Sequence, residues 1–166
     1  MTKKLLHPGD LFPALTVNLP AGRTLGLPGA MTGHFGVVLF YRGSWCPYCN
    51  AQLSAFQRSL DSLAEMDVMV VALSVDDQAA TQELIAKHGL RFPVGHSADA
   101  TTIAEATGAF VNPGPRYLQS TGFVLDPAGR VVVSVYSSGA IGRLVPQDVV
   151  GLVRYLREHA SASQSR

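Results

Sequence analysis

Two cysteines separated by two residues are the most chemically informative feature of this sequence. Cys46 and Cys49 are its only cysteines. In a reducing compartment, so close a pair is more often catalytic or metal-binding than structural. Zinc needs about four ligands, and none of the five histidines is spaced as part of a second ligand pair. A purely structural disulfide would close too short a loop to stabilise the fold much. We therefore expect a redox-active dithiol that needs no metal and no bound cofactor, because its two sulfurs can carry both electrons.

The residue between the cysteines that matters most for position is Pro47. Proline is best tolerated at the first position of a helix, which makes Cys46 the N-cap and places Cys49 one turn inward. Unpaired backbone N–H groups and the helix dipole stabilise a thiolate at an N-cap, so the pKa of Cys46 should be low. Cys49 is then the resolving thiol. Arg42, four residues before Cys46, either adds positive charge to this site or lies solvated on the surface.

Buried strands and an amphipathic helix position the cysteine pair. Residues 37–41 and 68–75 are continuous apolar runs rich in β-branched side chains, as in strands buried on both faces of a parallel sheet. Between them, apolar residues recur at spacings of three and four, which predicts one helix over residues 47–64. Together these segments predict a βαβ unit with the dithiol at the strand-to-helix junction.

The remaining elements complete an α/β domain. Residues 15–19 and 24–27 predict an N-terminal β-hairpin, and residues 123–125 and 131–135 predict two antiparallel strands around a tight turn. Three further helices are expected: one from Asp77 to Gly89, one from Asp99 to Gly108, and one over residues 146–158. The sequence thus predicts a three-layer α/β/α sandwich with a mixed central sheet. Residues 1–166 form one domain, with a disordered tail at 160–166.

Composition excludes several classes of function. The chain has 166 residues, 47% of them apolar and 15% charged, and a formal net charge of +1. Without a basic field, nucleic acid is a poor candidate partner. The longest apolar run, residues 68–73, is far shorter than the roughly 20 residues of a membrane-spanning helix. No export signal is recognisable at the start of the chain, so we expect a soluble cytoplasmic protein that binds no membrane.

From Gly9 to about Glu158 the sequence resembles the peroxiredoxin-like AhpC/TSA group of the thioredoxin-fold superfamily. Three segments carry the resemblance: an opening segment at residues 9–15, the approach to the cysteines at residues 40–46, and a late hairpin at residues 121–129. The resemblance implies that Cys46 matches the nucleophilic cysteine of the family. Trp45-Cys46 is also similar to thioredoxins, and the Pro47-Tyr48 pair between the cysteines is that of many glutaredoxins.

Two positions depart from the peroxidase pattern. Peroxiredoxins have Thr or Ser three residues before the reactive cysteine, where this chain has Gly43, with Ser44 one step later. Their arginine ahead of the late hairpin is matched only loosely, because Thr121 stands there and Arg116 lies a few residues earlier. The full set of supporting candidates around the two cysteines is Arg42, Ser44, Trp45, Pro47, Tyr48, Arg116 and Thr121.

Three hypotheses follow for the function. The first is a dithiol/disulfide oxidoreductase of peroxiredoxin-like type, in which Cys46 attacks a disulfide or peroxide and Cys49 resolves the intermediate. The second is a dedicated thiol peroxidase in antioxidant defence. The third is a non-catalytic zinc-binding or redox-sensor module. For either enzyme the expected partners are the peroxide or disulfide substrate and a thiol electron donor, such as glutathione, thioredoxin or a glutaredoxin-like protein. A second copy of the chain, in a homodimer, is a further candidate partner.

Overall fold

The computed structural model describes residues 4–164, the last four by their backbone alone. A central sheet of five strands has the order β5-β4-β3-β8-β9. Its strands are β3 (Phe35–Phe40), β4 (Val68–Leu73), β5 (Val94–Gly95), β8 (Thr121–Leu125) and β9 (Val131–Tyr136). β3, β4 and β5 run parallel, whereas β8 is antiparallel to β3 and β9 is antiparallel to β8. The expected mixed sheet is confirmed.

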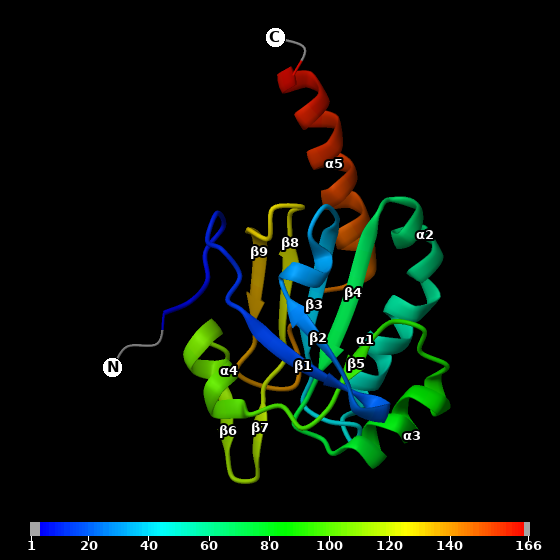
Figure 1. Ribbon diagram of the computed structural model, residues 1–166, viewed down its shortest axis with the longest axis vertical. Coiled ribbons are helices and arrows are strands. Elements are labelled where there is room, and N and C mark those ends of the chain that lie inside the picture. The colour runs from blue at the N-terminus through cyan, green and yellow to red at the C-terminus, as the bar shows by residue number, and fades with distance from the viewer. Residues whose placement is uncertain (1–3, 165–166) are drawn as a thin grey trace.

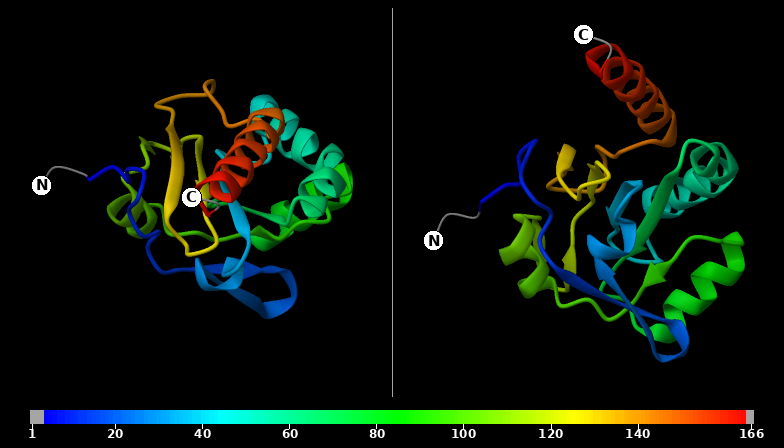
Figure 2. Two further views of the ribbon diagram at one scale, coloured as in Figure 1. Left: turned by 90° about the horizontal axis from the view of Figure 1, so that it is seen from above. Right: turned by 45° about the horizontal axis from the view of Figure 1, so that its top comes forward.

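Both faces of the sheet are covered, as the alternating side chains of β3 show. Val37 and Leu39 face one hydrophobic core, and Val38 and Phe40 face the other; all four are fully buried. The first core is covered by α1 (Pro47–Arg58), α2 (Leu60–Glu65), α3 (Gln78–His88) and α5 (Pro146–Gln164). The hairpin of β1 (Leu15–Leu19) and β2 (Arg23–Leu27) covers the second, together with α4 (Ala100–Thr107). Seen from above, the hairpin and α5 lie on opposite sides of the sheet (Figure 2).

The predicted helix termini agree with local capping chemistry. The carboxylates of Asp77 and Asp99 accept hydrogen bonds from backbone N–H groups in the first turns of α3 and α4. Gly89 and Gly108 end those helices in the left-handed conformation, which glycine adopts without a Cβ clash. These two helices therefore begin and end where the sequence predicts.

Two helix predictions need correction. The helix expected over residues 47–64 is divided at Ser59, whose backbone N–H bonds to the carbonyl groups of both Ala55 and Gln57, so that α1 and α2 are separate. The last helix continues past the predicted end at Glu158 to Gln164, into the segment expected to be disordered, because no glycine or proline follows to end it. Residues 165 and 166 of that expected tail lie outside the described residues.

Small elements that the sequence did not predict lie near the carboxyl ends of the parallel strands. They are the two-residue strand β5 and a hairpin of β6 (Val111–Pro113) and β7 (Arg116–Leu118), which extends at the lower edge of Figure 1. Single-turn 3₁₀ helices follow β1 and β2, at Pro20–Gly22 and Gly29–Met31. The β6–β7 hairpin matters for function because it brings Tyr117 toward the start of α1.

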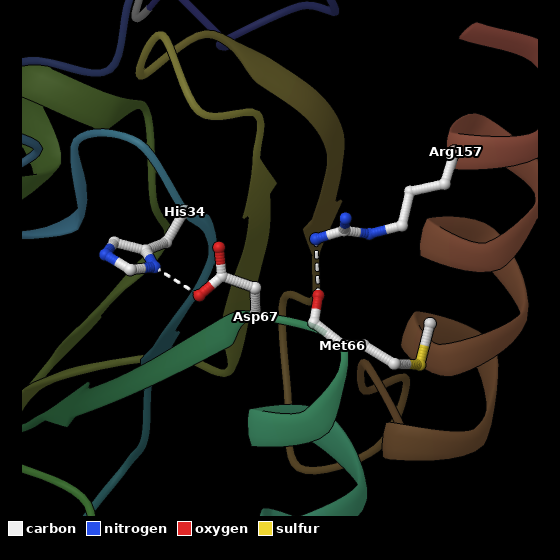
Figure 3. Close-up of polar contacts among 4 residues, drawn as sticks. All are labelled: His34, Met66, Asp67 and Arg157. Atoms are coloured by element: carbon white, nitrogen blue, oxygen red, sulfur yellow. Dashed lines mark hydrogen bonds and ion pairs between the residues drawn. The ribbon is translucent and has the colours of Figure 1, made fainter. Parts of the chain in front are cut away.

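The amino-terminal end of β3 is held by polar contacts between distant segments. Figure 3 shows His34 pointing at the Asp67 carboxylate, to which its Nδ1 bonds, and Arg157 of α5 donating to the carbonyl oxygen of Met66. These contacts join the turn between α2 and β4 to β3 and α5. These contacts lie at the end of the sheet opposite Cys46. They hold the amino-terminal end of β3, while the carboxyl end of the same strand leads to Cys46 and α1.

Candidate active site

Cys46 is the N-cap of α1, as its position before Pro47 predicts. Its Sγ accepts a hydrogen bond from the backbone N–H of Cys49 at 3.3 Å, and Pro47 occupies the first turn. The Sγ of Cys49 in turn accepts the backbone N–H of Arg42, also at 3.3 Å. Both cysteines are free thiols with no solvent-exposed surface. The strand-to-helix turn therefore supplies each sulfur with a backbone donor.

Two arginines from distant parts of the chain lie against the sulfurs. Arg42 Nη1 is 3.7 Å from the Sγ of Cys46. Arg143, in the loop between β9 and α5, places Nη2 at 3.6 Å from the Sγ of Cys46 and 3.1 Å from that of Cys49. Both guanidinium groups are only partly exposed. Arg42 thus lies beside the dithiol, and so does Arg143, which the sequence did not indicate.

The surroundings separate the acidities of the two thiols. Burial alone would raise the pKa of Cys46, but hydrogen bonds from the Cys49 thiol, the Cys49 backbone N–H and Arg42, together with the charge of Arg143, lower it below its ordinary value. Burial raises the pKa of Cys49, and the hydrogen bond that Cys49 gives to Cys46 raises it further. The N-cap sulfur is therefore the better thiolate, and the inner sulfur holds its proton.

Amide side chains hold each arginine in place. Gln52, buried one turn after Cys49, accepts Arg143 Nη1 at 2.9 Å and donates to the Leu144 carbonyl at 2.8 Å. Gln119 accepts Arg42 Nε at 3.0 Å. Gln52 lies on the buried face of α1, three residues after Cys49. A polar residue at that helical spacing from a cysteine is a signal that the sequence contains. For Arg143, 94 residues beyond Cys49, no local pattern indicated the contact.

Aromatic side chains border the site. The ring of Trp45 meets the ring of Tyr117 edge to face at 4.9 Å between centroids, and the Arg42 guanidinium lies 5.0 and 5.2 Å from those two centroids. The Tyr117 hydroxyl also accepts Arg42 Nη2 at 2.9 Å. Trp45 and Tyr48 are each 54% exposed. They give the surface next to the buried thiols an apolar, aromatic character.

The other predicted candidates take supporting or separate positions. Ser44 acts through its backbone: its N–H donates to the Asp76 carboxylate at 2.7 Å, and its carbonyl accepts Asn50 Nδ2. The Thr121 hydroxyl donates to the Gln119 carbonyl at 3.0 Å. The Arg116 guanidinium bonds to Thr101 on α4 instead of to either cysteine. Arg116 therefore lies apart from the dithiol, and Arg143 is the second arginine that lies against the sulfurs.

A hydroxyl side chain three residues before Cys46, as in peroxidases of this kind, would require the Trp45 ring to move. A Cβ at Gly43 would overlap the indole ring of Trp45, with Nε1 as the nearest atom. The glycine therefore makes space for the tryptophan. Across residues 4–164 the structure contains no group of three or more His, Cys, Asp or Glu side chains that could hold a metal ion.

Comparison with known proteins identifies the family. Residues 8–134 match the model of the AhpC/TSA family. The chain belongs to the AhpC/TSA family. The peroxiredoxin Bcp of Bacillus subtilis (strain 168) is 28% identical over 129 residues, covering 75% of this chain and 81% of that protein. The thiol-disulfide oxidoreductase ResA of Bacillus anthracis is 28% identical over 102 residues, covering 60% of this chain and 54% of that protein. This AhpC/TSA protein is a thiol-based redox enzyme.

Solved structures agree on the fold. The peroxiredoxin-like protein from Aquifex aeolicus superposes with a TM-score of 0.80 at 18% identity, covering 93% of this chain and 90% of that one. AhpC from Mycobacterium tuberculosis gives a TM-score of 0.75 at 21% identity, covering 93% and 94% of the two chains. The thioredoxin-like α/β/α architecture expected from the sequence is thereby confirmed. Within the described residues, no helix combines the length and apolar character that a membrane crossing requires.

Proposed function

We propose that this protein is a dithiol/disulfide oxidoreductase of peroxiredoxin-like type, with Cys46 as its nucleophile and Cys49 as its resolving thiol. The observation that carries the proposal is the opposite shift of the two thiols: the pKa of Cys46 is lowered, and that of its hydrogen-bonded neighbour Cys49 is raised. The attacking sulfur must be a thiolate. The resolving sulfur is best kept protonated until the first step is complete.

The chemistry runs in two balanced steps. The Cys46 thiolate attacks one sulfur of a substrate disulfide, forming a mixed disulfide and expelling the other substrate sulfur as a thiolate. Cys49 then loses its proton to solvent or to the departing thiolate and attacks the Cys46 sulfur, which forms the Cys46–Cys49 disulfide and expels the second substrate thiol. The substrate gains two electrons and the protein loses two. A thiol donor such as glutathione, thioredoxin or a glutaredoxin-like protein would reverse the change.

A specific observation also supports the second candidate, a dedicated thiol peroxidase in antioxidant defence. The guanidinium groups of Arg42 and Arg143 lie within 3.7 Å of the Cys46 sulfur, where charged donors could stabilise the charge that develops on a peroxide oxygen. Against this candidate, the Trp45 ring fills the space that a hydroxyl side chain at position 43 would need. In a peroxidase reaction, the peroxide would oxidise Cys46 to a sulfenic acid and leave as water or alcohol. Cys49 would then attack the Cys46 sulfur, form the disulfide and release water.

Stopped-flow measurements on one sample separate the two enzymes. The reduced protein is mixed with hydrogen peroxide in one series and with a disulfide-bonded protein in another, and oxidation is followed by the fluorescence of Trp45, the only tryptophan. We expect disulfide exchange to be the faster reaction at equal concentrations. Peroxide oxidation near the diffusional range would reverse the order of the two candidates, and the absence of both reactions would refute the enzyme proposal in favour of a sensor.

The cellular location, the zinc-binding alternative and the oligomeric state each have a separate test or argument. A cytoplasmic location suits a dithiol that must return to its reduced state in each cycle. A metal assay on protein purified without added zinc tests the zinc-binding module, for which stoichiometric zinc would be the positive result. Light scattering during size-exclusion chromatography decides between a monomer and a homodimer.

A further inference from the structure

The two arginines at the dithiol have only neutral partners besides the sulfurs. Arg42 donates to the Gln119 amide oxygen and the Tyr117 hydroxyl, and Arg143 donates to the Gln52 amide oxygen and the Ala140 carbonyl. In the part of the chain that the structure describes, neither guanidinium forms an ion pair with a carboxylate.

The acidic residue beside the cysteine turn is otherwise engaged. The Asp76 carboxylate accepts the backbone N–H of Ser44 at 2.7 Å. It fixes the turn and has no ion pair with either arginine. The negative charge available to the two guanidinium groups at contact distance is therefore that of the thiolate.

This charge changes during the redox cycle. In the reduced state a Cys46 thiolate neutralises one of the two positive charges. In the mixed disulfide both sulfurs are neutral, and the two half-exposed guanidinium groups have no carboxylate of the described residues as counter-charge. Uncompensated charge away from bulk water is costly. In the mixed disulfide, a negative charge on the attached substrate can therefore replace that of the thiolate.

We infer that the preferred substrate of this site is a disulfide that carries carboxylate groups close to its sulfur atoms. The inference rests on the proposed disulfide exchange and adds the substrate's charge to it. In the first step Cys46 bonds to one substrate sulfur, the other leaves as a thiolate, and the carboxylate that remains attached lies against the arginines. The attack by Cys49 then releases the second thiol together with its carboxylate.

The geometry of the guanidinium groups suits this role. Arginine has five N–H donors in a planar fork that matches a carboxylate. Nη2 of Arg143 directs its donors at the two sulfurs in the reduced protein, and a disulfide is a much weaker acceptor than a thiolate. Oxidation therefore frees those donors for a carboxylate at the moment when charge is needed. The exposed rings of Trp45 and Tyr48, next to Cys46 in the chain, can contact the carbon atoms of such a substrate.

A charge series of small disulfides tests the inference on the unmodified protein. The probes are 3,3′-dithiodipropionate, which is anionic, 2-hydroxyethyl disulfide, which is neutral, and cystamine, which is cationic. Single-turnover oxidation of the reduced protein is followed by Trp45 fluorescence. Each rate constant is divided by that of dithiothreitol with the same disulfide, which removes the intrinsic reactivity of the probe.

We expect the normalised rate constant to fall from the anionic through the neutral to the cationic disulfide, by about tenfold across the series at low salt. The spread of rate constants should shrink in 0.5 M salt, because the screening length of the solution falls from about 10 Å at 0.1 M to about 3 Å at 1 M. Arg143→Gln and Arg42→Gln should each reduce the spread. Arg154→Gln, which removes the same charge from an exposed position on α5, should leave it unchanged.

The outcomes separate the inference from the function on which it rests. If no disulfide oxidises the protein, the proposed oxidoreductase function fails. If all three oxidise it at normalised rates within twofold of one another, the function stands and the charge preference is refuted. If the charge preference is found, a peptide disulfide flanked by Asp should oxidise the protein faster than its Asn counterpart, and equal rates would confine the preference to small molecules.

Discussion

Replacing Arg143 by glutamine should make Cys46 a weaker acid and a slower nucleophile. The guanidinium lies 3.6 Å from the Cys46 sulfur and 3.1 Å from that of Cys49. At about 4 Å, two unit charges interact by about 1 kcal/mol in a water-like medium and about 4 kcal/mol at an effective dielectric constant of about 20. Because the arginine charge is delocalised and partly solvated, we take about 1 to 2 kcal/mol. At about 1.4 kcal/mol per factor of ten, the thiolate fraction below its titration midpoint falls about fivefold to thirtyfold.

The assay is the rate of alkylation by iodoacetamide between pH 5 and 9, with mass spectrometry to locate the modified cysteine. Below the titration midpoint of Cys46 in the unmodified protein, the Arg143→Gln protein should react at Cys46 about fivefold to thirtyfold more slowly. The difference should vanish at high pH, where the thiol is ionised in both proteins. Arg143→Lys keeps the positive charge and should recover part of the rate.

A charge-matched control variant and two outcomes decide whether the charge of Arg143 stabilises the thiolate. Arg154→Gln removes one positive charge from the exposed face of α5 and should alkylate like the unmodified protein. If Arg143→Gln keeps its thermal unfolding midpoint and its rate of alkylation at Cys46 has the same pH midpoint as in the unmodified protein, Arg143 does not stabilise the thiolate. If Arg143→Lys is as slow as Arg143→Gln, the hydrogen bonds of the guanidinium matter and its charge does not.

Four other changes have definite expected outcomes. At pH 6, the thiol left in Cys49→Ser should alkylate faster than the thiol left in Cys46→Ser, and the reverse order would exchange the two roles. Oxidation should give a monomer two hydrogens lighter, with its disulfide between Cys46 and Cys49, and a disulfide-linked dimer would contradict this. Gly43→Thr should displace the Trp45 ring and change its emission spectrum without accelerating peroxide oxidation; an unchanged spectrum with faster oxidation would show that the hydroxyl fits. Burial raises the pKa of Tyr41 to about 12 from 10.0, so its contribution to stability is complete below pH 10 and is lost between pH 10 and 12, by about 3 kcal/mol. Chemical unfolding should show a smaller alkaline loss in Tyr41→Phe, and equal losses would contradict the burial effect.

Features set by neighbouring residues were predictable from the sequence. Pro47 after Cys46 places the sulfur at the N-cap, and Asp77 and Asp99 begin their helices by accepting backbone N–H groups. Each of these signals acts within one helical turn, so a single sequence contains all that it requires. The buried strands around the dithiol were predictable for a similar reason, because burial on both faces produces an unbroken apolar run.

The rest of the site depends on contacts between segments far apart in the chain. Arg143 reaches the cysteines because the loop between β9 and α5 passes beside α1, where Gln52 donates to the Leu144 carbonyl, and nothing in the residues around position 143 indicates that contact. Tyr117 reaches Arg42 through the β6–β7 hairpin, whose strands have three residues each. Arg116, one residue before Tyr117, matches the family's arginine only loosely in the sequence, and its guanidinium bonds to Thr101.

The enclosure of the two sulfurs has a consequence for how long each molecule survives under oxidative stress. A cysteine oxidised once, to the sulfenic acid, is lost to further chemistry only if a second peroxide reaches it and carries it to the sulfinic acid. Here the Cys46 sulfur has no exposed surface, and the backbone N–H of Cys49 already contacts it at 3.3 Å. If peroxide oxidises Cys46, we expect the thiol of Cys49, one helical turn away, to capture the sulfenic acid before a second peroxide arrives from solvent. Under that proposal the cysteine pair would protect Cys46 from the overoxidation that inactivates a solitary cysteine.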